Sequence, residues 1–390
     1  MELRARPFAI HVEDAVLADL RVRLNSARWA DQVQDAGWEQ GTERETLRSL
    51  MAHWADGFDW RACERDLNAL PQFKADVRGL GMHFVHQRAE RGRGLPILLV
   101  NGWPSTFVEE LPLVPLLTDP QAHGIACPAF DVVIPSLPGY GFSDRSPRVG
   151  MTPRAAAEMF VALMRGLGYE RFAAHGSDFG AEVLTQLALA SPQHLVGLHL
   201  STFDWRPYLG AGSRSPSPAE RVYLAARAGW VEAEHAYDQL QSTKPQSLGY
   251  ALNDSPVGLA GWMLEKWRSW SDCGGDVVGH FGRDFLLAML TIYWVTETAT
   301  SSARLYYDHR RYQAPLGPRD HVDAPTAVAL FHHSFVSEGV PPREWAQRLF
   351  NLRRWTDMPR GGHFAATEEP VLLATDIAAF FGGADCDSQP

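Results

Sequence analysis

The sequence predicts an α/β fold built on a doubly wound, mostly parallel sheet, and three observations lead to this prediction. Short, continuously apolar segments alternate with helical patterns from residue 95 onward, as they do where helices cover both faces of a parallel sheet. One strand pattern runs directly into a helix through a turn with two flanking glycines. Two further stretches, residues 1–90 and 205–315, fall outside this alternation.

The expected elements follow one another in a regular order. Residues 95–101 and 130–135 are mostly apolar, which predicts two buried strands, and each is followed by a loop rich in glycine and proline. Thr152 and Pro153 predict the start of a helix, because threonine caps helices and proline is favoured at the first helical position. The remaining elements are strands at 195–200, 326–331 and 352–355 and a last helix at 368–381.

The turn with two glycines lies within residues 171–192 and has the form of a nucleophile elbow. Gly176 and Gly180 flank Asp178, and this spacing presents the central side chain at the top of an α/β-hydrolase sheet. Ser177 stands one place too early to be the central residue. A carboxylate nucleophile displaces a leaving group from a saturated carbon and leaves an alkyl ester that water then cleaves. The elbow therefore favours epoxides or alkyl halides over peptides and ordinary esters.

The two stretches outside the alternation predict additions to the α/β core. Residues 1–90 are largely helical in pattern, while 205–315 begin with a Pro/Gly/Ser-rich loop and continue as helices rich in tryptophan and tyrosine. An insertion between strands would lie over their C-terminal ends, where such sheets bind ligands. We therefore predict a helical N-terminal extension at 1–90, an α/β-hydrolase core at 91–204 and 316–390, and a helical lid at 205–315.

The composition favours a small, neutral substrate. The chain of 390 residues has 46 acidic and 36 basic side chains, so its net charge of -10 does not attract nucleic acid or an anionic membrane. Its four cysteines are too scattered for a metal site or a disulfide framework, and we expect neither a metal nor a cofactor. Charged residues interrupt every apolar run near the N-terminus, which predicts a soluble, cytoplasmic protein. Arginine greatly outnumbers lysine, a bias that we associate with high-GC bacterial genomes.

A histidine near the C-terminus is the candidate base. His363 follows two glycines between the last predicted strand and the last helix, in the chain order of α/β-hydrolases. A histidine in such a loop is more often an ordinary surface residue, but its combination with the elbow favours a role in activating water. The oxyanion formed during ester hydrolysis needs two backbone donors, and the candidates are the N–H groups of Phe179 and Trp103.

An epoxide oxygen needs a proton when its ring opens, and tyrosine hydroxyls are suitable acids. The predicted lid contains five tyrosines, and spacing alone does not choose among them: Tyr237, Tyr250, Tyr293, Tyr306 and Tyr307.

Several motifs of this sequence resemble those of the microsomal-type epoxide hydrolases, and the resemblance covers nearly the whole chain. The motifs are Asn-Gly-Trp-Pro-Ser-Thr from Asn101, the elbow Gly-Ser-Asp-Phe-Gly, the lid segments 237–245 and 253–259, and Arg-Gly-Gly-His-Phe-Ala-Ala at 360–366. The resemblance implies that two lid tyrosines bind the epoxide oxygen. It assigns them to Tyr237, eight residues before the proline of a Ser-Thr-Lys-Pro run, and to Tyr306, beside which Tyr307 is the alternative.

The sequence departs from this family at two places. The family usually has histidine where this chain has Asn101, and we expect this change to leave the backbone donor of Trp103 intact. The family also places the acid that orients its histidine where this chain has Ser334. Glu338, on the same predicted loop, is our candidate for that acid, and Asp204, after the strand that follows the elbow helix, is the alternative.

The resulting prediction is an epoxide hydrolase that forms vicinal diols through an aspartyl ester. Four tryptophans of the predicted lid suggest a bulky, aromatic or polyketide-like epoxide from bacterial secondary metabolism, although they can equally form the core of the lid: Trp262, Trp267, Trp270 and Trp294. A haloalkane dehalogenase is one alternative, but those enzymes resemble one another in a tryptophan at the position of Phe179. A catalytically retired hydrolase that only binds is the other. We expect no partner beyond the small-molecule epoxide, and the oligomeric state is open, with a homodimer compatible.

Overall fold

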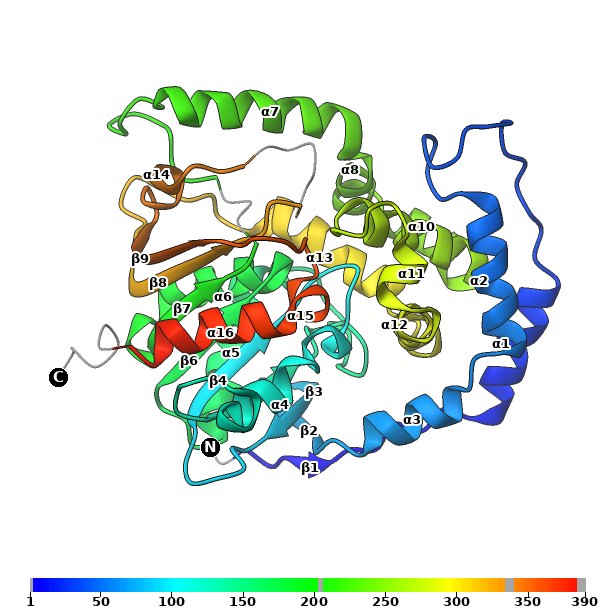
Figure 1. Ribbon diagram of the computed structural model, residues 1–390, viewed down its shortest axis with the longest axis horizontal. Coiled ribbons are helices and arrows are strands. Elements are labelled where there is room, and N and C mark those ends of the chain that lie inside the picture. Colours follow the sequence, from blue (N-terminus) through cyan, green and yellow to red (C-terminus); the bar gives the residue numbers. More distant parts are fainter. Residues whose placement is uncertain (1–2, 203–205, 334–339, 384–390) are drawn as a thin grey trace.

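The computed structural model describes residues 3–202, 206–333 and 340–383 and builds them around one large sheet (Figure 1). The strand order is β1-β2-β3-β5-β4-β6-β7-β8-β9. The pairs from β5 to β9 are parallel, whereas β1, β2 and β3 extend the sheet in antiparallel fashion. The strands are β1 Arg6–Pro7, β2 Gln72–Val77, β3 Leu80–Gln87, β4 Leu95–Val100, β5 Phe130–Pro135, β6 Phe172–Gly176, β7 Leu195–Leu200, β8 Val322–Leu330 and β9 Phe350–Asp357.

The observed sheet is the mostly parallel α/β-hydrolase sheet predicted from the sequence. The strands expected at 130–135 and 195–200 are β5 and β7. Strand β8 begins four residues earlier than expected and so includes Pro325, which the predicted strand left out. Pro325 lies at a shift in the register with β9, and this shift accommodates its missing N–H. The hairpin of β2 and β3 was not expected within the helical N-terminal stretch.

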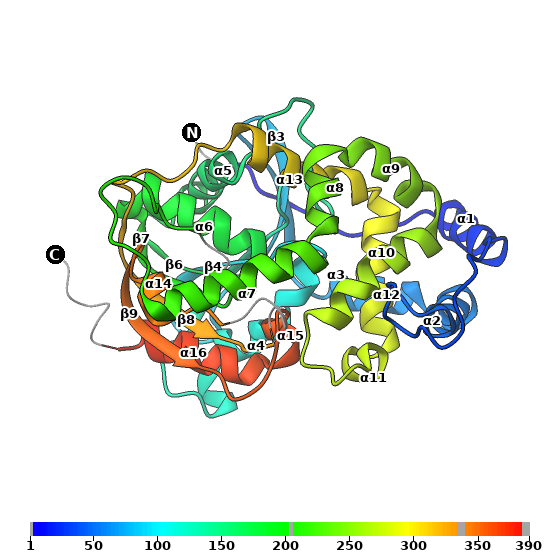
Figure 2. The ribbon, with the colours of Figure 1, turned by 90° about the horizontal axis from the view of Figure 1, so that it is seen from above.

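Helices cover both faces of the sheet, as its continuously buried central strands require. Figure 2 shows α5 and α6 on one side of the sheet and α4 and α16 on the other. The last helix, expected at 368–381, is formed by α16 with the short α15 before it. These core helices are α4 Leu113–Thr118, α5 Pro153–Gly166, α6 Asp178–Ala190, α14 Arg343–Ala346, α15 Ala365–Glu368 and α16 Pro370–Phe381.

A helical insertion separates β7 from β8 and lies beyond the C-terminal ends of the parallel strands (Figure 1). It comprises α7 Pro218–Glu234, α8 Ala236–Thr243, α9 Pro245–Asp254, α10 Pro256–Ser269, α11 Val277–Phe281, α12 Arg283–Thr296 and α13 Ala299–Tyr312. Among the residues described, no helix is both long and apolar enough to cross a membrane.

The N-terminal helices pack against this insertion from outside. They are α1 Asp14–Asn25, α2 Arg44–Asp56 and α3 Trp60–Asn68, and α1 and α2 contact α10 while α2 also contacts α12. The indole of Trp54 donates a hydrogen bond of 2.9 Å to the hydroxyl of Thr291 on α12. Arg23 forms an ion pair of 2.7 Å with Asp254 at the end of α9. The N-terminal segment therefore connects the insertion to the sheet, which it joins through β1, β2 and β3.

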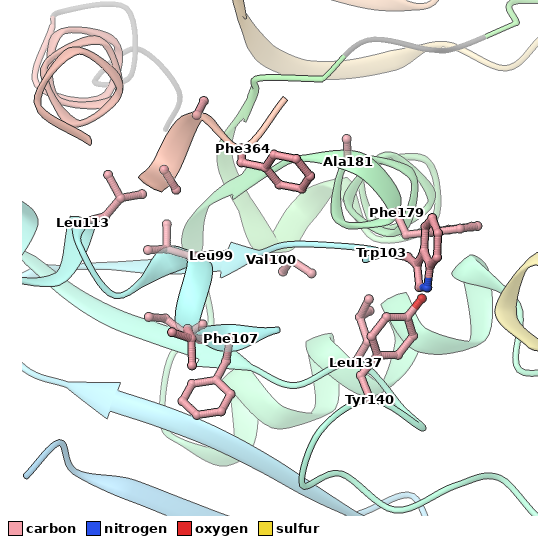
Figure 3. Close-up of a cluster of buried hydrophobic side chains, with 14 of the residues drawn as sticks. Leu99, Val100, Trp103, Phe107, Leu113, Leu137, Tyr140, Phe179, Ala181 and Phe364 are labelled. Atoms are coloured by element: carbon pink, nitrogen blue, oxygen red, sulfur yellow. The ribbon is translucent and has the colours of Figure 1, made fainter. Parts of the chain in front are cut away.

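The hydrophobic core extends from the sheet to the point where β4 and the start of α6 meet. In Figure 3, Leu99 and Val100 of β4 lie in this cluster, and the rings of Trp103, Tyr140 and Phe179 gather at its end. All five side chains are buried. The first turn of α6 is therefore set against closely packed apolar side chains.

Candidate active site

The turn between β6 and α6 holds Asp178 in a strained backbone conformation. Asp178 is the first residue of α6 and has a φ of 48°, a region that residues other than glycine rarely adopt. A Cβ atom at Gly180 would lie 1.9 Å from the carbonyl oxygen of Val100, so only glycine allows the helix to approach β4 so closely. The local sequence therefore builds the elbow that was predicted and points the Asp178 side chain into the site.

Two backbone N–H groups hold one oxygen of the Asp178 carboxylate. Oδ1 accepts hydrogen bonds from the N–H of Trp103 at 2.9 Å and from the N–H of Phe179 at 2.7 Å. The carboxylate also lies at the N-terminus of α6, where the helix dipole favours negative charge. These are the two donors that the sequence predicted for the oxyanion hole. Asn101 donates through its side-chain amide to the carbonyl of Gly102 at 3.2 Å and leaves the N–H of Trp103 available.

His363 contacts the other oxygen of the same carboxylate. Its Nε2 lies 3.3 Å from Oδ2 of Asp178, and its side chain is almost fully buried. The backbone N–H of His363 donates to the carbonyl of Trp270 at 2.8 Å, and the rings of these two residues lie 5.0 Å apart. The structure thus brings together the predicted nucleophile and the predicted base, with Trp270 packed against the base.

Two tyrosines of the insertion lie over Asp178, the predicted nucleophile. Tyr237 on α8 stacks on Trp103, with ring centroids 5.5 Å apart and planes 9° apart. Tyr306 on α13 lies edge-on to Phe179 at 4.6 Å, and the two tyrosine rings are 6.1 Å apart. Both tyrosines and Asp178 line one cavity of about 140 Å³.

The structure also distinguishes Tyr306 from its neighbour. Burial, together with the nearby Tyr237 hydroxyl and Asp178 carboxylate, raises the pKa of Tyr306 well above its usual value, so Tyr306 stays protonated at neutral pH. Tyr307 instead contacts Tyr312 and the guanidinium of Arg311 and does not line the cavity. Of the two, Tyr306 is the one that lines the cavity together with Asp178.

The predicted acid partner of His363 lies outside the described residues. This holds for Glu338, for the alternative Asp204 and for Ser334, which occupies the position where the family has its acid. The assignment of Glu338 therefore stays a prediction.

Only one of the four tryptophans singled out in the sequence reaches the site. Trp270 packs on His363 and lies 5.2 Å from the ring of Tyr237. Trp267 stacks on Phe364, whereas Trp262 donates to a glutamine of α8 and Trp294 lies beneath the guanidinium of Arg23. Trp262 therefore packs within the insertion, whereas Trp267 joins the insertion to the segment that carries His363 and Trp294 joins it to α1.

Sequence reasoning missed five polar residues that line the same cavity: Glu182, Thr202, His235, Asp238 and His309. A signal was present, because Glu182 stands four residues after Asp178 and His309 three residues after Tyr306, so both share a helix face with a predicted site residue.

Two family models match the chain. The model described as "Epoxide hydrolase N terminus" matches residues 5–110, and the one described as "alpha/beta hydrolase fold" matches residues 96–207. A protein of Stigmatella aurantiaca, described provisionally as an epoxide hydrolase, is 39% identical over 96% of this chain and 84% of its own length. Epoxide hydrolase 1 of Sus scrofa is 36% identical over 97% of this chain and 88% of its own length.

Solved structures of similar proteins agree with these matches. The juvenile hormone epoxide hydrolase of Bombyx mori superposes with a TM-score of 0.84 at 27% identity, covering 98% of this chain and 94% of its own. The epoxide hydrolase of Aspergillus niger superposes with a TM-score of 0.83 at 29% identity, covering 97% of this chain and 96% of its own.

Proposed function

Because the chain belongs to the epoxide hydrolase family and is an enzyme of that kind, we propose that it converts its epoxide to a vicinal diol through an ester on Asp178. One observation carries this proposal. The two oxygens of the Asp178 carboxylate have different surroundings, since Oδ1 lies between two N–H donors and Oδ2 faces His363. A carboxylate held in this way can attack with one oxygen and carry negative charge on the other.

The first step opens the epoxide ring. Oδ2 of Asp178 attacks a ring carbon, a C–O bond of the ring breaks, and the released oxygen takes a proton from a tyrosine hydroxyl. Tyr306 suits this role because its raised pKa keeps it protonated, and Tyr237 lies beside it as a second hydrogen-bond donor. Two tyrosines over the nucleophile favour an epoxide oxygen over a halide as the leaving group.

The second step cleaves the ester with water. His363 removes a proton from water, which attacks the carbonyl carbon of the ester, and the charge that develops on Oδ1 is stabilised by the N–H groups of Trp103 and Phe179. The tetrahedral intermediate then expels Oδ2 with the diol, which takes the proton from His363, and the remaining proton of the water passes from the regenerated carboxyl group to the tyrosine that gave up its proton in the first step. Glu338 is the acid that we propose to orient His363 during this step.

The substrate that we propose is a hydrophobic, aromatic or polyketide-like epoxide. The rings of Phe179, Tyr237 and Tyr306 in the cavity support an aromatic substrate, because such rings pack well edge-to-face. The helical insertion would act as a lid that excludes bulk water during both steps.

A single turnover in ¹⁸O-labelled water tests this mechanism. With enzyme in excess over styrene oxide, the diol should contain no label while the protein gains one labelled oxygen at Asp178. The Asp178→Asn variant should give neither an adduct nor a diol. Label in the diol of the first turnover would rule out the ester and favour direct attack by water.

A further inference from the structure

One end of the catalytic cavity is polar, and the two proposed reaction steps do not use it. Glu182 lies one helical turn after Asp178 on α6 and lines the same cavity. Its side chain is only 17% exposed, and Nε2 of His309 on α13 lies 3.5 Å from one of its carboxylate oxygens. Within the described part of the chain, no other group forms a hydrogen bond or an ion pair with Glu182. A largely buried carboxylate therefore faces the space that the substrate enters.

A second observation at the same cavity is independent of this carboxylate. Thr202, just beyond the end of β7, also lines the cavity and is only 4% exposed. Its hydroxyl finds no hydrogen-bond partner among the described residues. Because a buried hydroxyl without a partner is unfavourable, the ligand is the natural source of the missing hydrogen bond.

The remaining contacts show how a substrate would reach this polar end. Phe179 packs edge-on against Tyr306 at 4.6 Å and against the ring of His309 at 6.0 Å, so an aromatic wall runs between the nucleophile and Glu182. Side chains four residues apart on a helix start about 6 Å from each other, which sets the spacing between Asp178 and Glu182. A substrate attacked by Asp178 would thus place a group across an aromatic ring from the epoxide beside Glu182.

We propose that Glu182, assisted by Thr202, selects epoxides that carry a hydrogen-bond donor, a hydroxyl or an ammonium group, on the far side of an aromatic ring. The carboxylate accepts a hydrogen bond from either donor, and the threonine hydroxyl completes the contact with a hydroxyl group. This inference rests on the proposed function, since it assumes that Asp178 attacks the epoxide. Glu182 is a specificity-determining residue and takes no part in making or breaking bonds.

The test compares three substrates: styrene oxide, 4-(hydroxymethyl)styrene oxide and 4-(aminomethyl)styrene oxide. For the native enzyme, kcat/KM should be about 10- to 100-fold higher for the two donor substrates than for styrene oxide, as expected for hydrogen bonds to a buried charge. Glu182→Leu should abolish this ratio through KM. Glu182→Gln should keep a preference for the hydroxyl and lose that for the ammonium group. Thr202→Val should reduce only the preference for the hydroxyl.

Glu170→Gln is the matched control, because Glu170 is a largely exposed carboxylate that pairs with Arg165 on the surface. In this variant the two ratios of kcat/KM to that of styrene oxide should stay as in the native enzyme. Equal KM values for the three substrates would overturn the inference. It would also fail if Glu182→Leu lowered kcat/KM by the same factor for all three, because Glu182 would then only hold α13 against α6.

A failure of the proposed function would give a different experimental result from a failure of this inference. If none of the three substrates gave a diol, the proposed reaction would be contradicted. The role of Glu182 would then be tested by measuring how tightly the product diols bind. The dissociation constants of the three product diols, measured by calorimetry with native and Glu182→Leu protein, should show the same order of preference. Equal constants for the three diols would reject the role of Glu182.

Discussion

Adding a single methyl group at Gly102 should disable the site and leave the fold intact. The Cβ atom of an alanine at this position would lie 2.0 Å from Oδ1 of Asp178 and 2.6 Å from the backbone nitrogen of Phe179. Ordinary contacts begin at 3.4 Å, so the carboxylate would have to retreat by roughly the difference of 1.4 Å. Gly102 itself does not have a positive φ, so its backbone accepts alanine without strain. The conflict therefore falls mainly on the nucleophile and the oxyanion hole.

This displacement predicts a large loss of activity. A shift of about 1 Å in a catalytic group can cost about 100-fold in rate, and loss of one oxyanion donor costs about 100- to 1,000-fold. We expect kcat for styrene oxide to fall by about 100- to 1,000-fold, or about 3 to 4 kcal/mol of transition-state stabilisation. Single-turnover diol formation measures this loss, and thermal unfolding reports the stability of the fold.

Gly229→Ala is the matched control for this variant. Gly229 lies in α7, and an added Cβ would meet nothing within 4 Å. The control should keep full activity and gain up to about 1 kcal/mol of stability, because alanine favours a helix more than glycine does. If Gly102→Ala retained activity within about tenfold of the native enzyme, a loss of about 1.4 kcal/mol or less, the proposed oxyanion hole would be wrong.

Further variants test the proposed base His363, the proposed proton donor Tyr306 and the buried carboxyl group of Glu110. His363→Gln should still be alkylated by styrene oxide but should accumulate the ester, visible as an adduct in the intact mass; rapid turnover without an adduct would contradict its role. Tyr306→Phe should slow alkylation by about 100-fold, whereas Tyr307→Phe should leave the rate unchanged, and equal rates in the two variants would refute the assignment. Burial raises the pKa of Glu110 from 4.5 to about 8, so the side chain costs no stability below pH 4.5, where it is neutral in the folded and the unfolded state, and stability falls as the pH rises from 4.5 to 8. Glu110→Gln should therefore raise Tm at pH 8 and flatten this fall, and an identical pH dependence in the two proteins would disprove the idea.

The central strands and the elbow could be predicted because their signals are local in the sequence. A strand buried on both faces is a continuous apolar run, and the elbow needs its glycines within a few residues of Asp178. The hairpin of β2 and β3 carried a different signal that was missed, because polar residues alternate with apolar ones along β2, as they do in a strand with only one buried face. Its two-residue turn consists of Arg78 and Gly79, both with a positive φ angle, and of the two only the glycine is a turn residue that can be recognised in the sequence.

The site residues of the insertion could not be predicted from short sequence patterns alone. Tyr237 and Tyr306 stand on helices α8 and α13, almost seventy residues apart in the sequence, and only packing shows that their rings meet. Their assignment therefore depended on the resemblance to a known family. Glu182 and His309 went unnoticed because helical spacing alone does not distinguish a residue that faces a cavity from one that faces solvent.

Trp103 explains how core and insertion can share one site. Its backbone N–H binds the nucleophile, while its ring stacks on Tyr237 and meets the edges of Tyr306 and Trp270 at 6.0 and 6.1 Å. A shift of the insertion would therefore act on the same residue that holds the attacking carboxylate. Because α1 and α2 brace the insertion from outside, the N-terminal segment limits such a shift. The distance between the carboxylate of Asp178 and the two tyrosines that we propose as proton donors is thus set by packing from three separate parts of the chain.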